Sequence, residues 1–459
     1  MFCARSLRLD RLVAVAVCST LILSLWGVTG AAAQPERGAE SMMAAHVADQ
    51  ALPARARSDS AASAASMAEI PQTQVDDSIE AGGYDDCCCC DARTSRGGIG
   101  WWVDASYMHW WVNGNAIPAL VTTNAIVPPR SQAGVLGIGD TNVLLGDEKL
   151  DGGGRAGVAL TLGGWLDEDR ALGVQATWLY AGDPSDQLDA RFQSPDIPVL
   201  ARPFFNAATQ QEDAQLVAYP DVVAGVTTAA SHSYLQSLEA LMRYNWRRGP
   251  GGRIDMLGGY RYLGFREDLR LEEHLVLVDP GGVAQIGTTI DLFDQFNTRN
   301  DFHGGEIGLV TSLYRGSLVF DIATKLGLGN VSRELTINGS TSVQTPSGGR
   351  ATTPGGLLAL PSNMGAYRDD SFALLPELDV KASWQLTDRL SVGVGYNLLF
   401  LTKVYRTGQQ IDRTIDASQL SGILPVNDTT AAVGRHPLPT LSNSTLRAQG
   451  LTVGLGLTF

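Results

Sequence analysis

The last stretch of the chain constrains its fold more than any other. From Leu446 to Phe459 the sequence reads LRAQGLTVGLGLTF, and from Gly450 onward apolar side chains alternate with Gly or Thr. Alternation with a period of two is typical of a β-strand. Because one face is apolar and the other carries only small, weakly polar groups, the pattern favours a strand of a transmembrane barrel, apolar outward and polar inward. An edge strand of a soluble β-sandwich is the alternative.

The composition fits such a barrel. Charged residues make up 18% of the chain, below the usual share, while 51 of the 459 residues are Gly. Strands that alternate between lipid and water average to a glycine-rich, charge-poor sequence. The formal net charge of −14 leaves no surplus of Lys or Arg to neutralise phosphates, so the sequence predicts no nucleic-acid partner.

The N-terminus has the features of a secretory signal peptide. Arginines precede an apolar run from Leu12 to Val28, and an Ala-rich cleavage site follows at residues 31–33. We therefore predict removal of residues 1–33 and export of the chain. Retention of the apolar run as an inner-membrane anchor is the alternative. Elsewhere, no stretch approaches the roughly 18 consecutive apolar residues of a transmembrane helix.

Residues 34–99 are predicted to form a disordered periplasmic linker, because they are rich in Ala, Ser, Asp and Gln and show no periodicity. They contain four adjacent cysteines, Cys87, Cys88, Cys89 and Cys90. Adjacent thiols match poorly the spaced ligands of a tetrahedral zinc site. In an oxidising compartment the cluster predicts disulfides to a partner or to another copy, and an unstructured tail with incidental cysteines is the alternative.

Residues 100–459 are predicted to form one all-β domain, a single antiparallel up-and-down transmembrane β-barrel. In the first strand Trp101 and Trp111 share the apolar face, roughly 33 Å apart along the strand. A tilt of about 40° reduces this to about 25 Å, the height of an apolar membrane band. The same alternation predicts further strands at Arg155–Leu166, Leu172–Tyr180, Ser233–Trp246, Arg253–Phe265, Phe302–Leu313, Ser317–Leu328, Phe372–Gln385 and Leu390–Leu401.

Short polar connections alternate with long ones along this domain. The short ones lie at Asp167–Arg170, Arg247–Gly252, Tyr314–Gly316 and Thr387–Arg389. Outer-membrane barrels alternate short periplasmic turns with long extracellular loops. The sequence therefore predicts about ten strands, or twelve if a long loop hides a hairpin of Leu269–Val278 with Val283–Ile290.

Aromatic side chains fall near both predicted ends of the spanning strands, where they favour the membrane–water interface. The predicted inner girdle contains Trp101, Trp246, Trp384 and Phe459. The predicted outer girdle contains Trp111, Tyr180, Tyr234 and Tyr262. His109 lies on the lipid-facing parity near the outer rim, and this pattern does not explain it.

Charged residues of both signs occupy the opposite parity and are expected to line the barrel interior. They are Arg155, Glu239, Arg243, Asp255, Arg261, Glu306, Asp321, Lys325, Glu377, Asp379 and Lys381. A ten-stranded barrel is only slightly wider than the eight-stranded kind, whose interior side chains fill. Because an unpaired buried charge is costly, we expect these groups to pair and to leave a plugged or very narrow barrel.

The long loops carry more apolar residues than a solvated loop needs, including Ile117, Leu120, Val121, Phe204 and Phe205. We expect these loops to pack on one another, to fold over the mouth of the barrel, or to contact a partner or ligand.

An enzyme is the competing class of protein. The histidines are scattered along the sequence, and none forms a recognisable Ser–His or Asp–His motif. His303 in the motif FHGGE is the best candidate for a catalytic base. Acidic loop residues, such as Asp291, Asp294 and Asp301, could bind Ca²⁺, although solvated surface charge is the commoner explanation. We predict no enzymatic activity, catalytic residue, metal or cofactor. A surface-exposed hydrolase and an adhesion or partner-binding barrel are the alternatives.

Eight segments between about Trp101 and Asp416 carry a resemblance to a known family. They read WWVDASYMHWWVNGNAIPALVTT, GDEKLDGGGRAGVALTLGGWLD, PVLARPFFN, LVAYP, LGGYRYLGFRE, FDQFNTRNDFHGGEIGL, ALLPELDV and GYNLLFLTKVYRTGQQID. In these segments the chain resembles the beta-barrel porin-7 family, best known from planctomycete-type bacteria. The resemblance implies an outer-membrane barrel with a porin-like role, and it supplies no catalytic residues.

Together these features predict an outer-membrane barrel with an envelope structural or narrow-pore role, its loops closing the external mouth. The expected partners are outer-membrane lipid, a disulfide partner for Cys87–Cys90, and the barrel-assembly machinery. The last follows because a C-terminal strand that ends in Phe resembles the sorting signal of bacterial outer-membrane barrels.

Overall fold

The computed structural model describes residues 100–459, except residues 280, 282–283, 423 and 427–435. The predicted signal peptide, the predicted linker and Cys87–Cys90 lie outside the described residues. In the described part of the chain, no helix is both long enough and apolar enough to cross a membrane.

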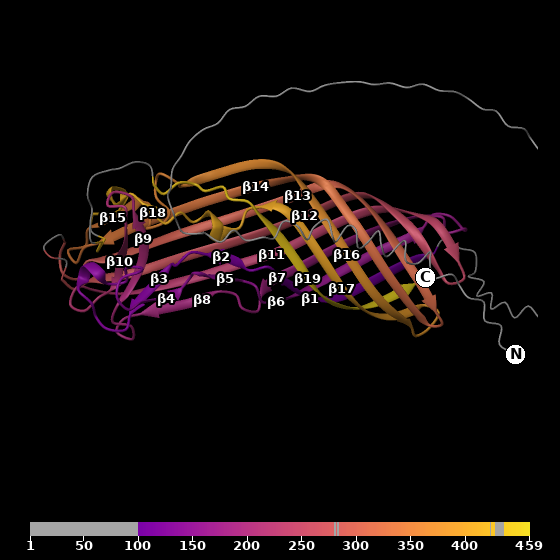
Figure 1. Ribbon diagram of the computed structural model, residues 1–459, viewed down its shortest axis with the longest axis horizontal. Helices are drawn as coiled ribbons and strands as arrows, with labels where there is room; N and C mark the ends of the chain where they lie inside the picture. The colour runs from indigo at the N-terminus through magenta and orange to yellow at the C-terminus, as the bar shows by residue number, and fades with distance from the viewer. Residues whose placement is uncertain (1–99, 280, 282–283, 423, 427–435) are drawn as a thin grey trace, which may run out of the picture. The chain divides into compact units, whose positions relative to one another are not determined.

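Within the described residues, ten antiparallel strands form a closed ring (Figure 1). The ring runs β1-β6-β7-β11-β12-β13-β14-β16-β17-β19, and β19 pairs back with β1. The ring strands are β1 (Trp101–Val112), β6 (Gly154–Trp165), β7 (Leu172–Pro184), β11 (Val223–Gly249), β12 (Gly252–Leu277), β13 (Thr289–Arg315), β14 (Leu318–Gln344), β16 (Gly365–Gln385), β17 (Leu390–Val404) and β19 (Ser444–Thr458). The C-terminal stretch is therefore a barrel strand, and each ring strand pairs with its neighbours along the chain.

The connections alternate as the sequence predicts. Short turns join β6 to β7, β11 to β12, β13 to β14, and β16 to β17, all at one end of the ring, called the turn end here. The chain enters and leaves the ring at this end, where the Phe459 amide donates a hydrogen bond to the Trp101 carbonyl at 2.9 Å. The opposite end, called the loop end, carries the long connections.

Strands β11, β12, β13 and β14 continue far past the other ring strands toward the loop end (Figure 1). They contain 26 or 27 residues each, about twice the length of β1. The segment Leu269–Val278 continues β12 up to Leu277 and pairs with the beginning of β13. It lengthens an existing hairpin, so the ring keeps ten strands and the twelve-stranded alternative is wrong.

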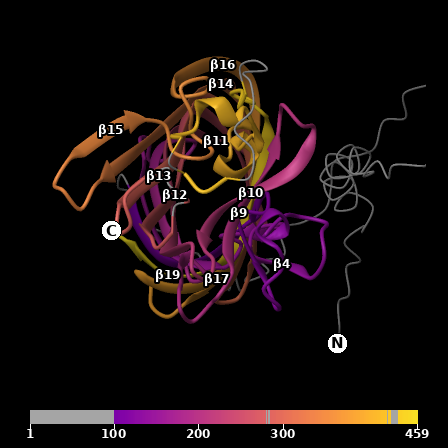
Figure 2. The ribbon, with the colours of Figure 1, turned by 90° about the vertical axis from the view of Figure 1, so that its left-hand side faces the viewer.

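The long loops fold into a separate small sheet at the loop end, called the cap here (Figures 1 and 2). Its strands are β3 (Val121–Asn124), β4 (Thr141–Leu145), β9 (Leu200–Asn206), β10 (Gln211–Ala218) and β18 (Thr414–Ile415). The remaining elements are β2 (Asn115–Ile117), β5 (Glu148–Leu150), β8 (Asp189–Gln193), β15 (Arg350–Pro354) and the short 3₁₀ helices η1 (Arg130–Gln132), η2 (Thr407–Gln410) and η3 (Ala417–Gln419). Leu120, Val121 and Phe204 are buried in one cluster with residues of the four long strands, so the loops pack over the mouth of the barrel.

The apolar face of β12 changes sides along its length. Near the turn end the outward residues Met256 and Tyr260 are exposed. Beyond Phe265 the inward residues, such as Leu269 and Leu275, join the buried core of the cap, while the outward residues are charged or polar. A similar change occurs on β13 and β14, and we call this level the polarity switch. On β11 the outward residues above this level include the small or apolar Ala224, Val226 and Ala230. One sheet thus meets an apolar phase on its outer face below the switch and an apolar core on its inner face above it.

Candidate functional site in the barrel interior

Strand β12 passes every layer of the interior in turn. Its inward residues Asp255, Arg261, Phe265, Glu267 and Glu273 are each no more than 4% exposed and follow one another from the turn end to the cap. Each belongs to a different cluster of side chains. The interior is therefore a stack of polar and apolar layers.

The central layer, called the ion network here, joins β11, β12, β13, β14 and β16, which follow one another around the ring. Arg261 of β12 contacts Glu377 of β16 at 2.7 Å, and Lys325 of β14 reaches both Glu377 at 2.7 Å and Glu239 of β11 at 3.0 Å. Arg261 also pairs with Glu239, and Glu306 lies 3.7 Å from its Nε. Lys325 and Glu377 face each other on neighbouring strands. The Arg261–Glu377 and Lys325–Glu239 pairs each link strands three places apart in the ring, so these two pairs cross the barrel interior.

The structure brings six of the eleven predicted interior charges into this network and places the other five elsewhere. Asp379 is the sixth member, 3.4 Å from Lys325. Nearer the turn end, Arg243 pairs with Asp255 at 2.6 Å. Lys381 pairs with Asp104, which the prediction did not include, and the hydroxyl of Ser312 donates to Asp321. Arg155 is fully buried at the loop end, where its guanidinium donates to Ser233 Oγ at 3.2 Å.

The Lys381–Asp104 ion pair near the turn end is more exposed than the Lys325–Glu239 pair of the ion network. The Lys381 and Asp104 side chains are 31% and 23% exposed, whereas those of Lys325 and Glu239 are 8% and 2% exposed. Between them, the Arg243 guanidinium lies over the rings of Trp102 and Trp165, 5.9 and 5.7 Å from their centroids. The charges of Lys325 and Glu239 are therefore shielded from solvent more fully than those of Lys381 and Asp104.

Above the network lies a buried apolar layer, called the apolar plug here, to which all ten ring strands contribute. Its fully buried members are Met108, Trp110, Val112, Leu235, Leu263, Phe265, Phe302, Val331, Ala373, Leu375, Leu399, Leu401, Val404, Leu446 and Ala448, with Ala159 and Leu179 packed against them. A Cβ added to Gly450 would lie 2.4 Å from Cδ1 of Trp110, so this glycine leaves room for the indole. Sequence reasoning missed the plug, although its signal is present: the inward parity turns apolar at the loop end of each strand.

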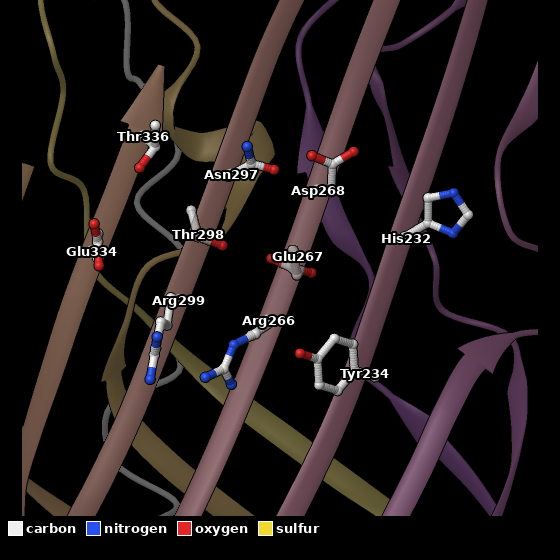
Figure 3. A pocket seen from close by; sticks show the side chains of 10 residues that line it. All are labelled: His232, Tyr234, Arg266, Glu267, Asp268, Asn297, Thr298, Arg299, Glu334 and Thr336. Carbon is white, nitrogen blue, oxygen red and sulfur yellow. The ribbon is translucent and has the colours of Figure 1, made fainter. Parts of the chain in front are cut away.

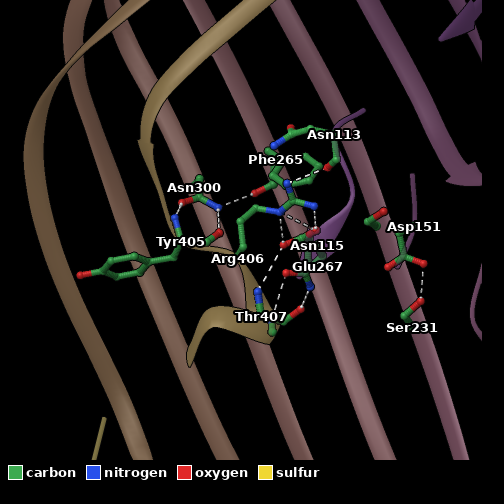
Figure 4. Close-up of polar contacts among 12 residues, drawn as sticks. Asn113, Asn115, Asp151, Ser231, Phe265, Glu267, Asn300, Tyr405, Arg406 and Thr407 are labelled. Carbon is green, nitrogen blue, oxygen red and sulfur yellow. Dashed lines mark hydrogen bonds and ion pairs between the residues drawn. The ribbon is translucent and has the colours of Figure 1, made fainter. Parts of the chain in front are cut away.

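A second ion pair closes the mouth above the plug (Figure 4). Arg406, in the connection after β17, donates from Nε to both carboxylate oxygens of Glu267 at 2.9 and 2.8 Å. Its Nη1 donates to the Asn113 carbonyl at 2.9 Å, and its guanidinium lies 5.4 Å from the ring centroid of Phe265. Asn300 holds the Tyr405 backbone through two hydrogen bonds. The loop before β19 is thus tied across the top of the barrel.

The cap is attached to the long strands by a third buried cluster. Arg202 of β9 contacts Glu273 of β12 at 2.6 Å and Asp294 of β13 at 2.8 Å, and all three side chains are 0% exposed. Burial works against the guanidinium charge, but the attraction of Asp294 and Glu273 outweighs it and raises the pKa of Arg202. Asp294 Oδ1 also accepts hydrogen bonds from the amides of residues 357–359. Arg202 and Glu273 were not predicted as site residues, because they lie outside the strands that the lipid pattern identifies. Asp294 was considered only as a possible Ca²⁺ ligand, and the structure pairs it with Arg202 instead.

The histidines and the acidic loop residues do not converge. His274 contacts Asp291 at 2.6 Å on the exposed outer surface, and His303 contacts the Tyr260 hydroxyl at 2.6 Å. Asp301 pairs with arginines on the outer surface, remote from the buried Asp294. Across the described ranges, no hydrogen bond joins a Ser, Thr or Cys side chain to a histidine ring, and no group of His, Cys, Asp and Glu could hold a metal ion.

A family model described as "Putative beta barrel porin-7 (BBP7)" matches residues 102–459. The chain belongs to this family. As a porin-7 family member it is an outer-membrane β-barrel protein. Because outer-membrane barrels have short periplasmic turns and long extracellular loops, we expect the turn end to be periplasmic. No curated protein matches the chain.

Solved structures with similarity to this porin-7 protein include three outer-membrane or transport proteins. The Escherichia coli outer membrane protease OmpT is 12% identical, with 80% of this chain and 100% of that chain covered and a TM-score of 0.33. A Pseudomonas aeruginosa FadL homologue is 9% identical, with 79% and 90% covered and a TM-score of 0.20. The P. putida toluene transporter TodX is 8% identical, with 80% and 90% covered and a TM-score of 0.14.

Exposed aromatic residues lie near both ends of the apolar outer surface of this porin-7 barrel. At the turn end these are Trp101, Trp246, Trp384 and Phe459, which are 51–71% exposed. Toward the loop end these are Trp111 and Tyr180, which are 37% and 39% exposed. The ring centroid of Tyr234 lies 6.2 Å from that of Tyr180. His109 packs edge-on against Trp111, with their ring centroids 4.8 Å apart. His109, which the sequence pattern did not explain, therefore belongs to the outer group of aromatic residues.

The polarity switch predicts opposite responses to the same new charge on one outer surface. Met242→Arg places a charge in the middle of the apolar band, where Met242 is 56% exposed, and we expect it to destabilise the folded barrel by about 2–4 kcal/mol. Asn338→Arg adds the same side chain to the outward face of β14 above the switch, and we expect no measurable loss. Urea titration of each variant in lipid vesicles, read as heat-modifiable gel mobility, checks this. Equal losses would contradict the placement of the band.

Proposed function

We propose that this protein is a closed outer-membrane barrel with an envelope structural role, which holds a folded cap outside the cell and does not form an open diffusion pore. The apolar plug is the observation that supports this best. Its fifteen fully buried side chains are each no more than 2% exposed. An ion or a polar solute would have to cross this layer without hydrogen-bond partners, which is costly.

The layers on either side of the plug support the same proposal. Below it, Arg261 and Lys325 already pair with Glu239 and Glu377, so these four charges are not free to bind a passing solute. Above it, Arg406 and Glu267 tie the last long loop across the mouth. Ten strands are also too few for the wide aqueous channel of general porins, which have about 16–18 strands.

Absence of enzymatic activity is part of the proposal. Membership of a porin family supports it. Nucleophilic catalysis needs a nucleophile in contact with its base. One arrangement in the described residues places Ser342 across the sheet from Asp291, with His274 on the far side of Asp291. There the carboxylate stands between the hydroxyl and the imidazole, and Arg350 Nε donates to Ser342 Oγ at 2.9 Å.

Planar-bilayer recording of the purified protein tests the proposal. We expect the wild-type protein to give no stable conductance steps under conditions in which a general porin gives nanosiemens steps. The double variant Phe302→Ala with Leu375→Ala removes bulk from the plug, and we expect it to give small, brief steps because water can then enter the cavity. Nanosiemens steps from the wild-type protein would refute a closed barrel. Small, stable conductance steps from the wild-type protein would show that the barrel is a narrow pore and would also overturn the closed-barrel proposal.

A further inference from the structure

A pocket of about 340 Å³ opens on the outward face of the four long strands (Figure 3). Tyr234, Arg266, Arg299 and Glu334 lie at one level across β11, β12, β13 and β14, because each is paired in register with the next. This level is above the polarity switch. The exposed apolar Leu238 lies four residues nearer the turn end on β11. The pocket therefore faces the head groups of the outer leaflet.

The two ends of the pocket differ in chemistry. Figure 3 shows the guanidinium groups of Arg266 and Arg299 side by side at one end, extending along their strands away from Asp268 and Asn297. Residue numbers on β12 fall toward the turn end, so the arginines extend toward the membrane. Asp268, Asn297 and Thr336 form the opposite end, farther from the membrane. A ligand in this pocket meets positive charge near the lipid and hydrogen-bonding side chains above it.

The two arginines at the positive end have N–H donors that are not used within the described part of the protein. Arg266 and Arg299 both pair with Asp301, which lies 3.5 Å from Arg266. Glu334, in register with Arg299, forms its ion pair with Arg368 at 3.1 Å. Within the described chain, the buried Nη1 atom of Arg266 has no hydrogen-bond partner. The Arg266 guanidinium lies 5.8 Å from the ring centroid of Tyr234, which fixes its position. Two guanidinium groups that share one acid retain donors for another anion.

We propose that this pocket binds the phosphorylated sugar head group of an outer-leaflet glycolipid. Its phosphate takes the donors of Arg266 and Arg299, in the geometry that guanidinium groups offer to phosphate. Its sugar hydroxyls and amides take the hydrogen bonds of Asp268, Asn297 and Thr336. In such a lipid the acyl chains lie in the membrane, the phosphate at its boundary and the sugars next to it. The pocket presents complementary groups at the matching heights.

Native mass spectrometry of the full-length protein in detergent tests this with lipid A, a diphosphorylated glucosamine disaccharide lipid, as the probe. We expect the wild-type protein to retain lipid A through gas-phase release. We expect the double variant Arg266→Gln with Arg299→Gln to bind it roughly tenfold or more weakly, because two charge-assisted contacts are lost. Asp301→Asn removes the competing carboxylate, and we expect it to bind lipid A more tightly than the wild-type protein.

Arg270→Gln is the matched control. Arg270 lies four residues further along the outward face of β12, pairs with Glu272 at 2.6 Å and stacks on Phe293 at 4.2 Å. Loss of binding in this control, or no loss in the double variant, would overturn the proposal. If phosphatidylglycerol bound as tightly as lipid A, the pocket would be a general surface for anionic lipids, and the proposed sugar recognition would be wrong. Displacement of lipid A by millimolar inorganic phosphate would show that the arginines take free phosphate, and would overturn the lipid assignment. Heat-modifiable gel mobility checks that each variant is folded.

Discussion

Replacing Arg202 by Met is expected to loosen the cap while leaving the barrel folded. The change removes the cation that lies between Glu273 and Asp294, all three of which are fully buried. Breaking a buried ion pair from one side costs about 3–5 kcal/mol, because an uncompensated charge remains behind. Native-state hydrogen exchange should show this loss of protection in β9 and β10, and limited proteolysis should cut the cap loops. Heat-modifiable gel mobility should stay that of the wild-type barrel.

Arg413→Met provides the control within the same cap. Arg413 also pairs with a carboxylate, Glu212 at 2.6 Å, but the two side chains are 19% and 32% exposed. A partly solvated pair of this kind contributes less than about 1 kcal/mol. Similar protection in both variants would show that the Arg202 cluster does not hold the cap in place. Loss of the folded barrel in Arg202→Met would show instead that cap and barrel fold as one unit.

Replacing Arg261 by Met is expected to destabilise the barrel itself. Arg261 pairs with Glu239 and Glu377 and lies near Glu306, so its loss leaves Lys325 as the remaining cation of the network. We expect a loss of about 3–5 kcal/mol, since carboxylates stay buried with too little compensation. Urea titration of the folded band in detergent measures this loss.

Lys381→Met provides the matched control near the turn end. Lys381 pairs with Asp104 on the same inward face of the barrel, but these side chains are 31% and 23% exposed. Water can solvate the carboxylate that remains, so we expect a loss below about 1 kcal/mol. If Arg261→Met proved as stable as Lys381→Met, the network would have to be hydrated, and it would no longer support the closed barrel.

The membrane-spanning half of the fold could be predicted from alternation alone. The pattern placed the beginnings of β7 at Leu172 and β17 at Leu390, where the structure has them. It succeeded because each spanning strand meets lipid on one face and the interior on the other, which is a strictly local constraint. Family membership followed from the same region of the chain.

The extended half of the long strands was not predicted as a continuation of the ring strands, and Leu269–Val278 was expected only as one arm of a possible separate hairpin. Leu269 and Leu275 alternate as regularly as any spanning segment, but their apolar face points inward to the cap and not outward to lipid. Their role depends on Leu200 and Phe204 of β9, which are distant in sequence. Alternation shows that two faces differ and does not show which side of the sheet is covered.

The candidate site could be predicted in its composition but not in its pairing. The parity of Glu239, Arg261, Lys325 and Glu377 indicated an interior position. Which of these groups meet depends on the stagger between strands, and a single sequence does not encode that stagger in any local pattern. The Arg406 to Glu267 pair was missed for the same reason, because 139 residues separate its partners.

The polarity switch also determines how deeply the protein sits in the membrane. A vertical slip by one pleat, which is two residues or roughly 5 Å after strand tilt, would be opposed in both directions. A deeper position would bury the charged side chains of Arg266 and Arg299 in hydrocarbon. A shallower position would expose Leu238 and its apolar neighbours to water. The immersion depth therefore has a single energy minimum, and the cap stands at a constant height above the cell surface.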